Sequence, residues 1–180
     1  MTSKTFLNDV TRSHEDIVQL LLSLLEETRS AYCIIGGLAV NAYAEPVVSL
    51  DLDIVVVADR IDALLTTVLA KGMKAQKFEH SLNLSASTSD LRIQVQTDPR
   101  YQEFIPRAER RNVLGYEMTV ASLKDVLRGK LWAYSDETRR ASKRQKDLAD
   151  IMRLAETYPE LKDEIPPAIA ERIGYGLATM

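Results

Sequence analysis

The sequence predicts an α/β or α+β protein, in which a strand–helix–strand unit and further strands precede a helical C-terminal part. Apolar residues recur at helical spacing between positions 17 and 25, which indicates a helix within residues 14–30. Two aliphatic runs, 31–35 and 49–57, have the length of buried strands and stand on either side of a diglycine. From residue 122 onward helical periodicity dominates. We therefore expect a core over 1–120 and a helical part over 121–180 that packs on it or forms one domain with it.

The individual elements follow from local start and stop signals. Ser13 is the expected N-cap of the first helix, and Glu15 and Asp16 then lie in its first turn, where acids complement the helix dipole. Residues 38–44 are expected to form a short helix that Pro46 ends. The remaining expected elements are a helix over 60–72 closed by Gly72, short strands over 73–80, 81–88 and 90–97, a charged helix over 100–112, a strand near 116–120, and helices within 122–136 and 142–159.

Composition narrows the class of protein. With 180 residues and 46% apolar content, the chain can bury the core of one compact domain. A net charge of −3 gives no overall nucleic-acid signature, so any basic surface must be local. Cys33 is the single cysteine and lies in an apolar run, which favours a buried structural thiol in a reducing compartment. The longest apolar stretch, 18–27, is too short to span a bilayer, so we expect a cytoplasmic protein without membrane contact.

Gly36 and Gly37 stand between an expected strand and an expected helix. This arrangement presents backbone N–H groups at a helix N-terminus, which favours an anion such as a triphosphate. A tight turn without any ligand is an equally good interpretation of two glycines taken alone.

Asp51 and Asp53 raise the central question, because they stand two residues apart on a strand whose other positions are aliphatic. Side chains alternate along a strand, so both carboxylates point to one face, about 6–7 Å apart by the rise per residue. Two such carboxylates suit one Mg²⁺ or a pair of divalent cations completed by substrate phosphates. The alternative is a pair of surface acids at the start of the strand. It is weakened because Leu50, Leu52 and Ile54 commit the opposite face to the core.

Together these residues resemble a known family. The order Gly36-Gly37, helix, then Ser49, Asp51 and Asp53 as Ser-x-Asp-x-Asp is similar to the nucleotidyltransferase superfamily with the DNA polymerase β-like fold. The small bacterial members, including the AbiEii/AbiGii-type toxins, are the most similar. The resemblance implies a small mixed sheet flanked by helices. It implies that the diglycine holds nucleotide phosphates beside the Ser49 hydroxyl, and that the two acids bind Mg²⁺.

The implied reaction moves a nucleoside monophosphate from an NTP to a hydroxyl of RNA, protein or a small molecule. A toxin of this type is expected to have a cognate antitoxin as partner. One position departs from the family pattern, since Gln94 stands where a third carboxylate is expected. An amide can coordinate Mg²⁺ weakly but cannot act as a general base at neutral pH. Glu45, Asp90 or Asp98 are candidate substitutes; the alternative is an impaired enzyme that binds a nucleotide or a partner.

The basic run RRASKRQKD opens the last long helix, where basic side chains oppose the helix dipole. Binding a phosphate would offset this cost. By resemblance to the family, Lys143 and Lys146 are expected phosphate contacts, and Lys130 on the preceding helix reaches the same cleft. Asp147 is expected to organise Arg144 or Lys143 as an intrahelical pair. A solvated helix end is the alternative interpretation of the run.

Overall fold

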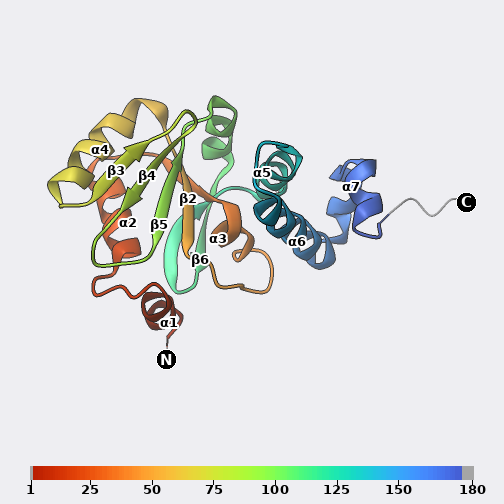
Figure 1. Ribbon diagram of the computed structural model, residues 1–180, viewed down its shortest axis with the longest axis horizontal. Coiled ribbons are helices and arrows are strands. Elements are labelled where there is room, and N and C mark those ends of the chain that lie inside the picture. Colours follow the sequence, from red (N-terminus) through yellow and green to blue (C-terminus); the bar gives the residue numbers. More distant parts are fainter. Residues whose placement is uncertain (1, 176–180) are drawn as a thin grey trace, which may run out of the picture.

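A seven-stranded mixed sheet forms the centre of the computed structural model, which describes residues 2–175 (Figure 1). The strands lie in the order β3-β4-β5-β2-β1-β7-β6. Their bounds are β1 (Tyr32–Ile35), β2 (Asp51–Val56), β3 (Lys74–Lys77), β4 (Ser81–Ser85), β5 (Arg92–Gln96), β6 (Glu109–Val113) and β7 (Tyr116–Val120). The α/β class expected from the sequence is confirmed.

Strand β2 lies at the centre of the sheet and sets the register of the polar residues. It pairs antiparallel with β1, with Ile35 opposite Asp53, and parallel with β5. The parallel register places Asp51 opposite Arg92 and Asp53 opposite Gln94. Side chains at paired positions of neighbouring strands share a face, so β2 and β5 present these four residues together.

Five of the helices lie toward the two ends of the molecule (Figure 1), with α2 and α4 in contact at one end, and α5, α6 and α7 following one another at the other. The short helix α3 contacts both α5 and α6, and so joins the sheet to the C-terminal helices. The bounds are α1 (Ser3–Val10), α2 (Ile17–Glu27), α3 (Gly36–Val40), α4 (Ile61–Ala70), α5 (Leu123–Ser135), α6 (Ala141–Thr157) and α7 (Pro167–Arg172), with 3-10 helices at Ala58–Arg60, Pro99–Arg107 and Pro159–Glu164. The division at residue 120 stays a prediction.

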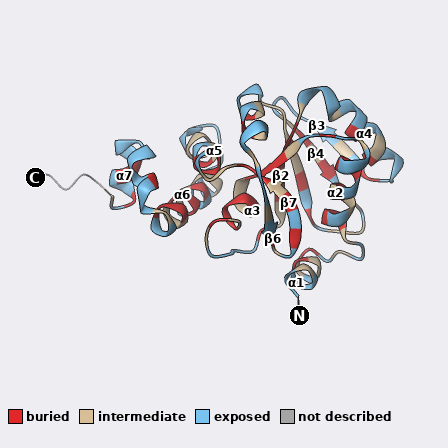
Figure 2. Cartoon of the chain, turned by 180° about the vertical axis from the view of Figure 1, so that it is seen from behind, coloured by how far each residue is buried: buried red, intermediate tan, exposed pale blue. Residues whose placement is uncertain are grey.

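The apolar core fixes the strands that carry the polar residues. Figure 2 shows buried positions running through the sheet and along the inner sides of the helices. In β2, Leu52 and Ile54 are fully buried, so that face of the strand packs into the core. Asp51 and Asp53 lie on the opposite face and are only partly buried. Cys33 in β1 is also fully buried, as expected, and burial raises the pKa of its thiol to about 12.

Some expected elements are wrong in their bounds. The first expected helix begins at Ile17, and its N-cap is Asp16, whose carboxylate accepts a 2.9 Å hydrogen bond from the Gln19 amide. Ser13 instead bonds the Ser89 hydroxyl, 2.6 Å away. Helix α1 was not expected from the sequence.

The prediction of a charged helix over 100–112 is likewise wrong. The chain forms a 3-10 helix only to Arg107, with Pro106 inside it, and then strand β6, which pairs antiparallel with β7. Leu114 and Gly115 take positive φ angles of 50° and 87° in the turn that joins β6 to β7. Within residues 2–175, no helix has the length and apolarity that crossing a bilayer requires.

Candidate functional site

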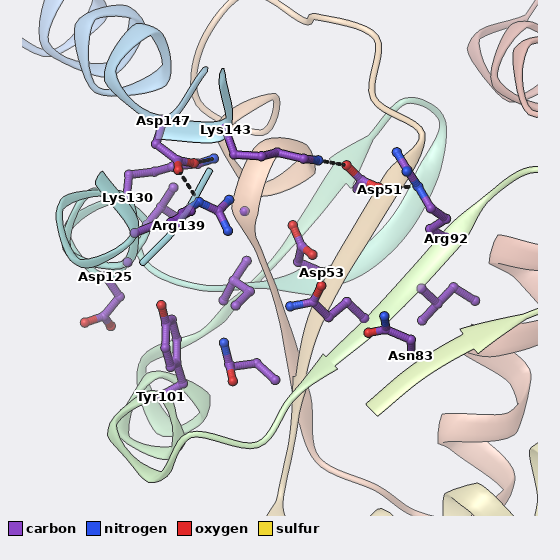
Figure 3. Close-up of a pocket in the computed structure, with 18 residues that line it drawn as sticks. Asp51, Asp53, Asn83, Arg92, Tyr101, Asp125, Lys130, Arg139, Lys143 and Asp147 are labelled. Atoms are coloured by element: carbon purple, nitrogen blue, oxygen red, sulfur yellow. Dashed lines mark hydrogen bonds and ion pairs between the residues drawn. The ribbon is translucent and has the colours of Figure 1, made fainter. Parts of the chain in front are cut away.

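A cavity of about 280 Å³ opens between the sheet and helices α5 and α6 (Figure 3). It combines Asp51 and Asp53 of β2 with Gly36 at the end of β1, and basic side chains reach it from β5, α5, α6 and the loop between these two helices. The titratable residues along its wall are Asp51, Asp53, Arg92, Tyr101, Asp125, Lys130, Arg139, Lys143 and Asp147. The two acids of the sequence motif and the first glycine therefore meet in one cavity.

Asp51 forms ion pairs with two basic side chains of the protein. The Arg92 Nε lies 2.7 Å from its Oδ1, and the Lys143 Nζ donates a 3.0 Å hydrogen bond to its Oδ2 (Figure 3). Burial by itself would raise the pKa of the Asp51 carboxyl. The hydrogen bond from Lys143 and the positive charges of Lys143 and Arg92 outweigh burial and lower the pKa below its usual range. Asp51 is thus fully ionised at neutral pH.

Asp53 has the opposite environment. Its carboxylate accepts no hydrogen bond and forms no ion pair within residues 2–175, and Figure 3 shows it facing the open part of the cavity. Burial is the largest influence on its carboxyl and raises the pKa above the usual range, and the neighbouring charge of Asp51 acts in the same direction. The positive charge of Lys130 opposes this rise without cancelling it. Because this partly buried carboxylate has no counterion among the described residues, a bound cation would stabilise its ionised form.

Gly36 makes room for that carboxylate. A Cβ atom at position 36 would lie 2.2 Å from Asp53 Oδ2, and the backbone there has a φ of +70°. Both the close approach and the left-handed conformation require glycine. Gly37 and Ser49 lie behind this corner and do not line the cavity: a Cβ on Gly37 would be 3.7 Å from Ser49 Oγ, which hydrogen-bonds the Asp51 backbone at 3.2 Å. Their place in the structure is to fix the turn and the start of β2.

The cavity face of β5 carries no carboxylate. Arg92, Gln94 and Gln96 occupy it, and Gln94 stands beside Asp53, as the sequence indicated. Across the next strand, Asn83 pairs in register with Gln94, and its buried Oδ1 has no hydrogen-bond partner among residues 2–175. Gln94 therefore places an amide beside Asp53 where the family pattern has a third acid, and Asn83 adds a second amide one strand further along the sheet.

None of the three candidate substitutes lines the cavity. Glu45 is exposed and contributes its backbone carbonyl to Arg153. Asp90 lies 3.6 Å from Arg12, and Asp98 binds Arg100 at 2.7 Å. Within the described residues, no group of three or more His, Cys, Asp or Glu side chains could hold a metal ion.

Lys130 lies at the back of the cavity and is almost fully buried. Its Nζ is 3.0 Å from Asp147 Oδ1 and 2.7 Å from Asp150 Oδ2, so one lysine of α5 binds two acids one turn apart on α6. Burial favours the neutral amine, but the two acids outweigh it and raise the pKa of Lys130. Asp147 also binds Arg139 Nε at 2.7 Å. The expectation that Asp147 pairs with Arg144 or Lys143 is wrong, because the helix directs it inward to α5.

The basic residues of α6 separate into two groups. Lys143 reaches into the cavity, whereas Lys146 is exposed and does not line it. Arg139, just before the helix, lines the cavity with 38% of its side chain exposed. Sequence reasoning did not identify Arg92 or Arg139 as site residues. Arg92 could have been found from its even spacing with Gln94 on one face of a strand.

The oxygen ligands at this site suit a single divalent cation that also binds water and substrate, and they are too few to enclose a cation with protein ligands alone. Mg²⁺ binds one or two carboxylates and completes its shell with waters and substrate phosphates. Asp53 supplies an unpaired carboxylate, and Asp51 supplies a second one that is shared with Lys143. Asn83 lines the same cavity two strands away from Asp53, with an unpartnered amide oxygen. Lys143 and Arg139 add positive charge at the mouth of the same cavity, where an anionic ligand would lie.

Several solved structures with a similar fold are nucleotidyltransferases or nucleotidyltransferase-like proteins. The chain is similar to ANT(2'')-Ia in complex with adenylyl-2''-tobramycin, with a TM-score of 0.61, 15% identity, and 88% of this chain and 95% of that chain covered. It is similar to the lincomycin-bound lincosamide antibiotic adenylyltransferase LnuA, with a TM-score of 0.56, 12% identity, and 79% and 99% covered. An antigenic nucleotidyltransferase-like protein from Paracoccidioides brasiliensis gives a TM-score of 0.52 at 17% identity, with 97% and 95% covered. No protein-family model and no curated protein sequence matches the chain. The chain therefore has the nucleotidyltransferase fold, as its diglycine and paired aspartates indicated.

Proposed function

We propose that the chain binds an NTP with Mg²⁺ in this cavity and transfers the nucleoside monophosphate to a hydroxyl group, which loses its proton while pyrophosphate leaves. The observation that carries the proposal is the meeting of Asp51, Asp53 and Gly36 with Lys143 and Arg139 in one cavity. Carboxylates for a cation and cations for an anion within one pocket suit a metal–triphosphate complex. The nucleotidyltransferase fold supports this assignment.

Each residue has a distinct part in the proposed reaction. Asp53 and Asp51 would hold the cation, which supplies Lewis acidity at the reacting phosphate. Lys143 and Arg139 would bind the triphosphate, and Gly36 keeps the corner beside Asp53 free of side chain. Lys130 does not contact the substrate in this proposal. It anchors α6 to α5 through its two buried ion pairs, and so fixes the helix from which Lys143 extends.

The acceptor is proposed more broadly, as a hydroxyl of a small molecule, RNA or protein. Two similar structures carry or act on antibiotics, since one contains adenylyl-2''-tobramycin and the other is a lincosamide adenylyltransferase. The sequence resemblance to AbiEii-type toxins points instead to RNA or protein, with a cognate antitoxin as partner. Expression of the wild-type chain in growing bacteria separates these: growth arrest that requires Asp53 supports the toxin role, and unchanged growth contradicts it.

The direct test uses α-labelled NTPs, Mg²⁺ and three acceptor pools: total RNA, total protein, and small hydroxylated compounds including aminoglycosides and lincosamides. Wild-type protein should transfer label to one pool, and Asp53→Asn should abolish the transfer. Asp90→Asn is the matched control, since it removes the same charge from an exposed residue outside the cavity. Transfer that survives Asp53→Asn would contradict the proposal.

A second candidate function is nucleotide binding without transfer, and the cavity face of β5 favours it. Arg92, Gln94 and Gln96 leave the acceptor hydroxyl without a carboxylate base. This candidate predicts that wild-type protein binds an NTP and transfers nothing, whereas Gln94→Asp transfers label. If wild-type protein labels an acceptor, this candidate is wrong.

A further inference from the structure

Both oxygens of Asp51 are taken by side chains of the protein itself. Arg92 reaches Oδ1 from the neighbouring strand and Lys143 reaches Oδ2 from α6, at 2.7 Å and 3.0 Å (Figure 3). Asp53, two residues away, has no such partner within residues 2–175. A cation that needs both carboxylates must therefore compete with an internal ammonium for one of them.

Lys143 is the partner placed to exchange, because it reaches Asp51 from α6, on the side of the cavity that Arg139 also lines, whereas Arg92 extends from the strand paired with β2. The Lys143 side chain is 38% exposed, and Asp51 is the one group that its ammonium hydrogen-bonds within the described residues. Its backbone, in contrast, is held, because Lys130 and Arg139 bind the buried Asp147 one turn further along α6. A rotation of the lysine side chain is thus sufficient to free Asp51 Oδ2, and neither helix needs to move.

We propose that Lys143 exchanges between two partners, binding Asp51 in the free protein and the triphosphate when a divalent cation takes its place on Asp51. The proposal rests on the proposed function. It assigns to Lys143 the coupling between metal and nucleotide.

The charges explain why the two ligands would depend on each other. A cation that binds alone displaces Lys143 and leaves an ammonium beside a dication, which is repulsive. A triphosphate that attracts Lys143 alone leaves Asp51 with Arg92 as its remaining partner, while phosphate charge approaches. When both ligands bind, the cation neutralises Asp51 and Lys143 neutralises phosphate, so each ligand removes the other's penalty. Coupling of this kind is reciprocal by thermodynamic necessity.

The test measures Mn²⁺ binding by the loss of the free Mn²⁺ signal in electron paramagnetic resonance. Wild type and Lys143→Gln are compared with and without a non-hydrolysable α,β-methylene ATP analogue. Because Lys143 competes for Asp51, the variant should bind Mn²⁺ alone several-fold to about tenfold more tightly than wild type. Because Lys143 also binds phosphate, the same variant should bind the analogue in saturating Mn²⁺ several-fold more weakly, by calorimetry. This reversal of sign distinguishes exchange from a role in phosphate binding alone.

Lys146→Gln is the matched control for Mn²⁺ alone, since it removes the same charge from the same helix without touching Asp51. It should change Mn²⁺ affinity less than Lys143→Gln does. Equal effects of the two variants, or no effect of Lys143→Gln, would overturn the exchange while nucleotide binding by wild type still upheld the proposed function. If the analogue does not bind wild type in Mn²⁺, the proposed function fails and the triphosphate half of the exchange fails with it.

Discussion

Asp51 and Asp53 stand two residues apart on β2, yet their surroundings shift the pKa values of the two carboxyls in opposite directions. Burial and the charge of Asp51 raise the pKa of Asp53, and the Lys130 charge only partly compensates. For Asp51, burial acts the same way, but Lys143 and Arg92 reverse it and lower the pKa. At neutral pH, the raised pKa of Asp53 therefore lowers the stability of the free protein, and the lowered pKa of Asp51 adds to it.

Asp53→Asn should raise the free energy of unfolding at pH 7, and Asp51→Asn should lower it. For Asp53→Asn, the gain in the free energy of unfolding develops as pH rises from the unfolded-state pKa of about 3.9 through the higher folded-state pKa. The gain should therefore vanish in acid. For Asp51 the stability is present above about pH 3.9 and is lost as pH falls through the lower folded-state pKa. Urea unfolding at pH 7 and near pH 3 measures both effects, and shifts of the same sign at pH 7 would contradict the assignment.

At position 36, the close approach of Asp53 and the left-handed backbone limit which residue can fit. Gly36→Ala must place a methyl group against the Asp53 carboxylate at a φ of +70°, whereas Gly72→Ala meets nothing within 4 Å at a φ of +78°. The left-handed conformation alone costs about 1–2 kcal/mol for a residue with a Cβ. We expect Gly72→Ala to lose about that amount and Gly36→Ala to lose more, as measured by urea unfolding. Equal losses would mean that Asp53 moves aside freely.

At the scale of the element, α6 begins in a way that does not favour a helix. Arg140 is its N-cap residue and makes no side-chain capping hydrogen bond, and the first turn contains no acid. Lys143 and Arg144 follow, so basic charge lies at the positive end of the helix dipole. The arrangement suits a helix whose N-terminus faces an anion.

Arg140→Ser should therefore stabilise the free protein by about 1 kcal/mol, because serine can accept a hydrogen bond from the first turn. Arg140→Ala is the control that removes the charge without supplying a cap, and it should gain only about 0.3 kcal/mol. Thermal and urea unfolding of both variants measure the difference. If the alanine variant gains as much as the serine variant, charge and not capping limits this helix end.

Helices α5 and α6 are joined by a buried ionic contact as well as by apolar packing. Lys130→Met should destabilise the protein by about 3 kcal/mol, because Asp147 and Asp150 would lose the buried cation that they share and keep only Arg139 and Arg153 as counterions. Lys124→Met, which removes an exposed partner of Glu164 from the same helix, should cost at most about 1 kcal/mol. Adding Asp147→Asn and Asp150→Asn to Lys130→Met should restore part of the loss. No recovery in the triple variant would show that the apolar stem of Lys130 carries the stability.

At the scale of the whole molecule, the sequence predicted the parts of the site that local patterns encode. The alternation of side chains along β2 and the diglycine were sufficient to predict that Asp51, Asp53 and Gly36 lie together. The pattern did not indicate Arg92 as the partner of Asp51, because that contact depends on the register between β2 and β5. Nor did it reveal that Asp147 faces Lys130, which depends on how α5 and α6 pack. A proline-containing 3-10 segment and strand β6 likewise replaced the helix expected over 100–112, since the pairing of β6 with β7 depends on tertiary structure that the local sequence does not encode.

Ligand binding to this one cavity should stabilise the whole chain, since the sheet and α5–α6 both line it. At a nucleotide concentration of about 100 times Kd, linkage gives about 2.7 kcal/mol. For a domain of this size we expect a rise in Tm of about 5–10 °C with ATP and Mg²⁺ together. The rise should be absent with AMP, which lacks the phosphates that Lys143 and Arg139 would bind, and absent in the Asp51→Asn, Asp53→Asn double variant. An equal rise in the double variant would place nucleotide binding elsewhere on the molecule and would leave the paired aspartates without the role that their position in the cavity suggests.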